Sequence, residues 1–273
     1  MTFQLAGTGP EIYEKVMVPL WFGRWAEALV DTVCLQASEK VLDVACGTGV
    51  TTRLAKEKVG PEGRVDGLDI NASMLTKAKE LADSLDIGWI ESDVSDIELP
   101  SDSYDVIMSQ HGYHYFPDKP AALGEFRRLL AQSGRMAFSI WDGHSPYTQA
   151  ICSAVERHIS PEIAAKQRSQ RETPSAEELA AQVSDAGFFG VNVHRQELMI
   201  EVPPADEFVP LHLGSMPIAG AFMALDEDTQ KALINDVSDA LEAYSQGDRM
   251  IYPDAVHVVV GYKYPPPNQP LAR

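Results

Sequence analysis

The sequence is poor in cysteine and contains no long apolar run. Its three cysteines, Cys34, Cys46 and Cys152, are too few and too widely spaced for a disulfide framework or a zinc site. They are typical of reduced thiols, so we expect a cytoplasmic protein. No apolar run reaches the roughly 18 residues that a membrane-spanning helix needs. The N-terminus lacks a basic stretch followed by an apolar one, so no signal peptide is expected.

Basic residues are also scarce. Lysine and arginine number 22 against 40 aspartates and glutamates, which gives a formal net charge of −18. Such a chain repels nucleic-acid phosphates and anionic membrane surfaces unless it concentrates a basic stripe, and the sequence shows none. We therefore expect a small molecule as partner and no nucleic acid. A hydrophobic content of 45% is typical of a globular protein and excludes wholesale disorder.

Short apolar segments alternate with helical patterns from residue 40 to residue 141. The expected strands are 40–45, 64–69, 87–91, 104–109 and 136–141. Alternation at this spacing predicts βαβ units and a parallel sheet with helices on both faces. Two later strands, 191–202 and 255–262, flank a helical excursion and are expected to pair antiparallel at the sheet edge. The predicted fold class is α/β: a Rossmann-like, doubly wound, mostly parallel seven-stranded sheet with an antiparallel late strand and a helical lid.

Local signals place several helix ends. Asn71 and Asp118 are expected to cap helix N-termini, and Gly134 is expected to form a left-handed cap after the helix that Asp118 opens. Pro19 is expected to break the N-terminal helical stretch in two. Because no linker interrupts the rest, we predict one domain over residues 1–264, followed by a proline-rich tail over 265–273.

The loop after the first strand is rich in glycine, with Asp43, Gly47 and Gly49 in the sequence DVACGTG. Glycines allow a sharp turn and let a ligand approach the backbone, and the following helix presents free N–H groups. Asp69 follows Gly49 by twenty residues and ends the second strand, where a carboxylate can accept both hydroxyls of a ribose. This pattern favours a nucleoside site over a plain turn in which Asp69 caps the next helix.

The type of nucleoside ligand depends on two further positions. A dinucleotide fingerprint has a third glycine, and Thr52 stands at that position. Asp43 lies four residues before Gly47, which disfavours a pyrophosphate there and suits an amino group or a sulfonium.

Five segments between residues 38 and 142 form an ordered set. They are VLDVACGTG (41–49), LDINASM (68–74), SDV (92–94), YDVIMS (104–109) and FRRLLAQSGR (126–135). This set resembles the motifs of class I S-adenosylmethionine-dependent methyltransferases. It is most similar to the small-molecule subgroup that includes ubiquinone- and menaquinone-biosynthesis enzymes. Ala45 stands where many members have glycine, and Gln132-Ser133 replaces the usual Pro-Gly.

The resemblance implies S-adenosyl-L-methionine as cofactor and S-adenosyl-L-homocysteine as product, held by a core over residues 38–142. At the methionine end, the backbone around Ala45, Gly47 and Gly49 would contact the methionine moiety, and Asp43 would steer its ammonium group. Gln110 would face the methionine part or the transferring methyl.

At the nucleoside end, the resemblance implies contacts with the ribose and the adenine. Asp69 would hold the ribose hydroxyls, and Ile70 and Met74 would pack on the adenine. Asp93 would accept a hydrogen bond from the adenine amino group beside the Val94 backbone. For Asp93 a loop cap, and for Met74 ordinary core packing, remain alternatives.

A cluster of aromatic and histidine residues, QHGYHYFPD, follows the fourth strand at 110–118. Aromatic faces attract a sulfonium and grip flat acceptors. His111 and His114 are candidate bases for an acceptor hydroxyl, and Tyr113 is a candidate positioning group. Packing against the next helix is the alternative for either histidine. No metal site is expected, because the pair has neither the spacing nor the glutamate of a zinc motif.

Residues 143–174 and 203–250 interrupt the core where the resembled family builds its acceptor lid. The resemblance therefore implies a methyltransferase for a small, hydrophobic or aromatic acceptor, with O-, N- or C-methylation left open. The apolar residues of these two segments equally suit a contact between two copies of the chain, so a homodimer is a further possibility. Two alternatives stay: an NAD(P)-dependent oxidoreductase, which the missing third glycine disfavours, and a non-catalytic S-adenosylmethionine-binding module.

Overall fold

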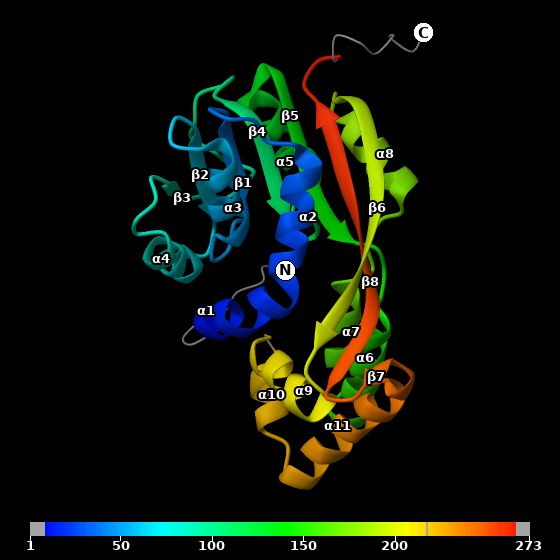
Figure 1. Cartoon of the computed structure of the whole chain (residues 1–273). Helices are drawn as coiled ribbons and strands as arrows, with labels where there is room; N and C mark the ends of the chain where they lie inside the picture. The colour runs from blue at the N-terminus through cyan, green and yellow to red at the C-terminus, as the bar shows by residue number, and fades with distance from the viewer. Residues whose placement is uncertain (1–8, 217, 266–273) are drawn as a thin grey trace.

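A mixed β-sheet runs through the computed structural model, which describes residues 9–216 and 218–265 (Figure 1). Its strand order is β3-β2-β1-β4-β5-β8-β6, and β7 pairs with β8. The strands are β1 (Lys40–Val44), β2 (Arg64–Asp69), β3 (Gly88–Glu91), β4 (Tyr104–Gln110), β5 (Leu130–Trp141), β6 (Phe189–Val202), β7 (Ser245–Gln246) and β8 (Arg249–Tyr262). β1 to β5 are parallel, whereas β8 is antiparallel to both β5 and β6. The predicted doubly wound sheet is confirmed, with β7 as a short addition.

Helices cover both faces of this sheet because successive strand residues point to opposite sides. Val41 and Val106 point toward α2 (Gly23–Val33) and α3 (Val50–Val59), and they share one core with the apolar residues of these helices. Leu42 and Ile107 point the other way and share a second core with α5 (Lys119–Leu129) and α8 (Ala176–Asp185). This is the burial that a parallel sheet covered on both faces requires.

The expected helix starts are present, but two other local predictions are wrong. The Asn71 side chain caps α4 (Ala72–Leu81) and Asp118 caps α5. Gly134, however, lies inside β5, because α5 passes directly into that strand at Leu130. Gly134 has no positive φ; a Cβ there would meet the Ala131 carbonyl oxygen at 2.9 Å, so close backbone approach is what favours glycine.

Pro19 does not break the N-terminal stretch. The chain continues without interruption through α1 (Gly9–Ile12), the π-helical segment η1 (Tyr13–Phe22) and α2. In an α-helix a proline clashes with the carbonyl four residues earlier. The wider π-helical winding pairs residues five apart and moves that carbonyl aside.

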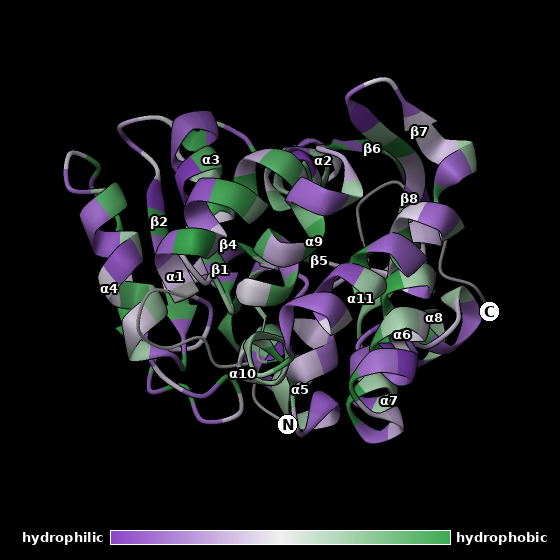
Figure 2. Ribbon diagram, turned by 90° about the horizontal axis from the view of Figure 1, so that it is seen from below, coloured by the Kyte–Doolittle hydropathy of each residue, from purple (hydrophilic) through white to green (hydrophobic). Residues whose placement is uncertain are grey.

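Several helices gather at one end of the long strands β6 and β8 (Figure 1). They are α6 (Pro146–His158), α7 (Pro161–Ser169), α9 (Ala205–Gly214), α10 (Ala219–Met223), α11 (Glu227–Ala240) and the short turn η3 (Glu242–Tyr244). Another short turn, η2 (Tyr113–Tyr115), follows β4. Figure 2 shows hydrophilic and hydrophobic residues alternating along these helices. Tyr147, Phe208 and Leu233 are their buried anchors in the core that also holds α2.

The tail predicted over 265–273 lies outside the described residues, apart from Pro265. Among the helices of residues 9–216 and 218–265, none is both long and apolar enough to cross a membrane.

Candidate active site

A cavity opens where β1, β2, β4 and β5 end, beneath the N-terminal helices. Its volume is about 220 Å³, far more than the roughly 15 Å³ that one water needs. One end, which we call the nucleoside end, is lined by Ala45, Gly47, Asp69, Ile70, Met74, Asp93 and Val94. The other, which we call the aromatic end, is lined by Trp21, Phe22, His111, His114, Trp141, Thr148, Ile151, Arg171, His212 and Met216. The carboxyl ends of parallel strands are where such sheets bind ligands.

The glycine-rich turn opens its backbone toward the cavity. Ala45 and Gly47 both have left-handed backbones, with φ of 56° and 57°. A Cβ on Gly47 would meet only the Met74 Cε, at 3.6 Å, so the cavity itself lies beside this residue. The Asp69 carboxylate fixes the turn, since it accepts hydrogen bonds from the backbone N–H groups of Gly47 and Asn71, each at 2.8 Å. Burial raises the pKa of Asp69.

Gly49 does not reach the cavity. A Cβ there would lie 2.6 Å from the Trp89 ring of β3, and its φ is 80°. Gly49 is therefore required for packing between α3 and the sheet and for its left-handed turn. The predicted contact between Gly49 and the methionine moiety has no support in this geometry.

Asp43 is fully buried and does not line the cavity. Its Oδ2 accepts a hydrogen bond from the Thr52 hydroxyl at 2.6 Å, while Oδ1 has no partner in the described structure. Burial raises the pKa of Asp43 to about 7. Asp43 therefore cannot contact an ammonium group in the cavity directly, and the steering of that group implied by the resemblance stays a prediction.

The remaining predicted residues of the nucleoside end line the cavity. Ile70 lines the cavity and is 47% exposed, so it offers an apolar surface that a bound ligand would cover. Met74 and Val94 are buried beside it. Asp93 lines the cavity and accepts a hydrogen bond from the Ser95 backbone N–H through Oδ1 at 2.8 Å.

Gln110 joins the two layers that enclose the cavity. Its Oε1 accepts a hydrogen bond from the Thr51 hydroxyl at 2.7 Å, and its Nε2 donates to the Phe22 carbonyl at 2.8 Å. The side chain lines the cavity while holding the N-terminal helix against α3. Glu14 adds a second tie, because it pairs with Arg53 at 2.5 Å.

His111 and His114 line the cavity, but their ring nitrogens are sealed. All four nitrogens are buried and have no hydrogen-bond partner in the described part of the chain. His111 has a left-handed backbone, φ 52°, and stacks on Trp141 with ring centres 3.8 Å apart. Burial lowers the pKa of His111 well below its usual value and that of His114 to about 3. Both imidazole rings are therefore uncharged at neutral pH where they line the cavity.

Tyr113 belongs to the protein core. It is fully buried, stacks on Phe138 at 4.1 Å and donates its hydroxyl to Gln182 at 2.8 Å. The side chain does not line the cavity, so the positioning role predicted for it is not available.

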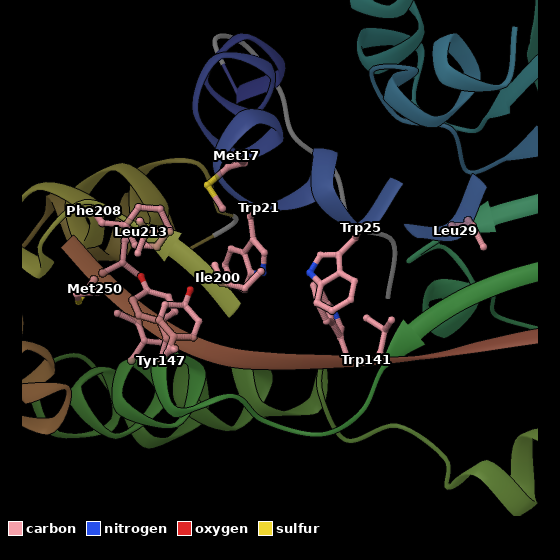
Figure 3. Close-up of a cluster of buried hydrophobic side chains, with 14 of the residues drawn as sticks. Met17, Trp21, Trp25, Leu29, Trp141, Tyr147, Ile200, Phe208, Leu213 and Met250 are labelled. Carbon is pink, nitrogen blue, oxygen red and sulfur yellow. The ribbon is translucent and has the colours of Figure 1, made fainter. Parts of the chain in front are cut away.

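The aromatic end also contains a buried charged group that the sequence does not indicate. Arg171 pairs with both oxygens of Asp254, at 2.7 and 2.9 Å, and lies 3.7 Å from the centre of the Trp141 ring. Trp21 donates its indole N–H to the same carboxylate at 3.1 Å. Figure 3 shows Trp21 lying between Trp141 and the lid residues Tyr147 and Phe208. No local sequence signal could have found these contacts, since Trp21 and Asp254 are 233 residues apart.

A family model described as "Methyltransferase domain" matches residues 35–186, more than half of the chain. The chain belongs to this methyltransferase family. Curated relatives include a demethylmenaquinone methyltransferase of Listeria welshimeri, 29% identical over 180 residues that cover 60% of this chain and 76% of the relative. A 2-phytyl-1,4-naphtoquinone methyltransferase of Thermosynechococcus vestitus is 35% identical over 144 residues, covering 51% and 63%. The methyltransferase thus spans slightly less than two thirds of that second relative.

Solved structures show the same fold. The YcgJ protein of Bacillus subtilis has a TM-score of 0.57 and 19% identity, covering 88% of this chain and 98% of its own. A Haemonchus contortus phosphoethanolamine N-methyltransferase 2 in complex with S-adenosyl-L-methionine has a TM-score of 0.58 and 15% identity, covering 93% and 56%. The methyltransferase is an S-adenosylmethionine-dependent enzyme, and nothing supports the oxidoreductase alternative.

The nucleoside end of the cavity fits this cofactor. The open backbone at Gly47 leaves room for a ligand at the turn. The exposed apolar face of Ile70 suits a flat base, and the Asp69 oxygens keep free lone pairs beside their backbone partners. No group of three or more metal-ligating side chains lies together in the described ranges.

Proposed function

We propose that the methyltransferase acts on an oxygen or a carbon of a small, flat, largely apolar acceptor bound at the aromatic end. The observation that carries this proposal is the single cavity that runs from Asp69 to the aromatic end. A donor held at one end and an acceptor at the other face each other without intervening water. Such alignment accounts for much of the rate of a displacement reaction.

The nucleoside end would hold the cofactor through Asp69, Asp93 and the backbone of Ala45 and Gly47. The cofactor supplies a methyl group on a positively charged sulfur. Gln110 and Phe22 would exclude water, since their mutual hydrogen bond closes the N-terminal helix over the cavity. The contribution of the chain is to orient both ligands and to keep the site dry.

The charge of the lining supports an oxygen or carbon acceptor over an amine. Both acidic residues of the lining, Asp69 and Asp93, lie at the nucleoside end. The aromatic end presents Arg171, whose charge Asp254 balances, together with neutral histidines. A cationic ammonium acceptor would find no free carboxylate among the residues that line this end. The names of the relatives, which are quinone methyltransferases, point to a quinol-like acceptor.

The helices of residues 143–174 and 203–250 would form the acceptor lid. Thr148 and Ile151 from α6, Arg171 after α7, and His212 and Met216 in or after α9 line the cavity. The methyltransferase's three free cysteines, of which Cys46 and Cys152 are buried, support a cytoplasmic location.

The proposal is tested by cofactor binding and methyl transfer together. S-adenosylhomocysteine should bind in calorimetry, and Asp69→Ala should weaken it by about 2 kcal/mol or more, because charge-assisted hydrogen bonds are lost. With methyl-labelled S-adenosylmethionine, naphthalene-1,4-diol and 1-naphthol should take up label in preference to 1-naphthylamine. Label on the amine alone would contradict the proposed acceptor, and unchanged affinity in Asp69→Ala would contradict the cofactor site.

A further inference from the structure

His212 lies at the far end of the cavity from the glycine-rich turn. It is carried by α9 and is only 3% exposed, yet it lines the cavity. Its ring meets the edge of Trp21 at 5.5 Å, and Trp21 in turn lies 5.8 Å from Phe22, which is 5.9 Å from His111. His212 is thus three ring contacts away from His111, in the part of the cavity where an acceptor would end.

One nitrogen of His212 is fixed by a buried tyrosine. Nδ1 lies 2.8 Å from the Tyr147 hydroxyl. Tyr147 is fully buried and does not line the cavity, and its hydroxyl has no other hydrogen-bond partner in the described residues. Burial raises the pKa of Tyr147, so the hydroxyl keeps its proton. That proton has Nδ1 as its acceptor, which leaves the imidazole hydrogen on Nε2.

The other nitrogen of His212 is not sealed, unlike the ring nitrogens of His111 and His114. The ring nitrogens of His111 and His114 are sealed without partners, but Nε2 of His212 is not among the sealed atoms. His212 lines the cavity and Tyr147, which holds its Nδ1, does not, so Nε2 is the ring nitrogen left for a ligand. Burial lowers the pKa of His212 to about 3, so the ring is neutral and its Nε2–H is a donor.

We infer that His212 is an acceptor-binding residue that donates its Nε2–H to an oxygen of the acceptor, in a tautomer that Tyr147 fixes. This inference rests on the proposed function and names the group that the acceptor carries at its far end: a phenol, phenolate or carbonyl oxygen. Arg171 near the same ring favours an oxygen with partial negative charge and disfavours an amine. His212 would select the acceptor; it is three ring contacts from His111, and we assign it no part in methyl transfer itself.

The tautomer is tested first, in the ligand-free protein. Nitrogen-15 spectra of histidine-labelled protein should show His212 protonated on Nε2 at pH 7. Tyr147→Phe should mix the two tautomers, because it removes the hydroxyl proton. Tyr252→Phe is the matched control: Tyr252 is equally buried and stacks on Tyr147 at 5.5 Å, but its hydroxyl has no partner in the described structure. An Nδ1–H tautomer in the unsubstituted protein overturns the inference.

The oxygen contact is tested by two probes that differ in one hydroxyl. The S-adenosylhomocysteine complex is titrated with 1-naphthol and with naphthalene, and the ratio of their Kd values is compared between proteins. His212→Phe should lower the preference for 1-naphthol about three- to tenfold, the contribution of one hydrogen bond. Tyr147→Phe should lower it less, and Tyr252→Phe should leave it unchanged.

The outcomes separate the two proposals. An equal ratio in His212→Phe and unsubstituted protein, or no binding of 1-naphthol by the complex, overturns the inference about His212. Failure of S-adenosylhomocysteine to bind contradicts the cofactor site instead, while the tautomer measurement still decides whether His212 presents a donor. Thermal unfolding of His212→Phe checks that the variant folds.

Discussion

The two ends of the cavity are built in different ways. The nucleoside end uses residues 45–94, which lie at or just after the ends of β1, β2 and β3, together with Met74 on α4. The aromatic end combines the N-terminal helix, the segment after β4, the lid helices and a carboxylate on β8. Short motifs therefore define the cofactor site, whereas the acceptor site exists only after distant segments have packed together.

The two ends also differ in charge. Carboxylates gather beneath and beside the glycine-rich turn, where burial raises the pKa of Asp43 and Asp69. Histidines gather at the aromatic end, where burial lowers the pKa of His111, His114 and His212. Burial thus favours the uncharged form of these side chains at both ends, and the following substitutions separate the contributions of the two ends.

The largest effect is expected from Arg171→Met at the aromatic end. The substitution leaves the Asp254 carboxylate buried without its partner, which typically costs 3–5 kcal/mol of unfolding free energy. Urea unfolding measures it. The matched control is Arg195→Met, because Arg195 pairs with Asp142 and Glu197 at the surface and should contribute less than about 1 kcal/mol. Equal losses of unfolding free energy in the two variants would show that the buried pair stabilises the protein no more than the surface pair does.

Asp43→Asn should change how stability depends on pH. The folded pKa of about 7 exceeds the unfolded value of 3.8, so the proton binds the folded state more tightly. The unsubstituted protein therefore loses stability as pH rises from about 4 to about 7, by about 4 kcal/mol in all. The asparagine variant should lack this loss, because its amide can still accept from Thr52 and does not titrate. Parallel curves of unfolding free energy against pH would contradict the assignment.

Gly47→Val should abolish cofactor binding. Valine disfavours a φ of 57°, and its side chain would project into the cavity beside Met74. We expect the S-adenosylhomocysteine affinity to fall at least about hundredfold, which corresponds to about 3 kcal/mol. Gly60→Val is the control for strain alone, since Gly60 has a φ of 74° and open space around it. Loss of affinity in both variants would point to unfolding.

The smallest effect is expected from His114→Phe. Removal of a general base typically lowers kcat by about 100-fold or more. Because the nitrogens of His114 are sealed and its pKa is about 3, we expect kcat with naphthalene-1,4-diol to fall less than about tenfold. S-adenosylhomocysteine affinity should be unchanged. A hundredfold fall in kcat alone would restore His114 as the base.

Much of the nucleoside end could be predicted because its signals are local. A turn glycine, a strand-ending acid and a helix cap can each be recognised from the residues next to them, as Gly47, Asp69 and Asn71 show. The errors arose where tertiary packing decides between two uses of one residue type. Gly49 packs on Trp89, and Asp43 turns toward Thr52, although their spacing equally suits a ligand contact.

The aromatic end could not be predicted in the same way. The sequence indicates the aromatic residues and the lid segments. It does not indicate that Tyr113 packs in the core or that Trp21 donates a hydrogen bond to Asp254. Tyr147 and His212 are 65 residues apart, and each has an ordinary helical surrounding. Only the packed arrangement shows which ring nitrogens of the cavity histidines are sealed.

The carboxylate of Asp254 receives hydrogen bonds from Trp21 and Arg171, and so joins the first helices, the loop after α7 and strand β8 at one point. Loss of this junction would loosen three walls of the pocket together. New acceptor preferences should therefore evolve through the rings and hydroxyls around the junction while it stays intact. In a library randomised at Asp254, Thr148 and Met216, active variants should retain the aspartate and diversify at the other two positions.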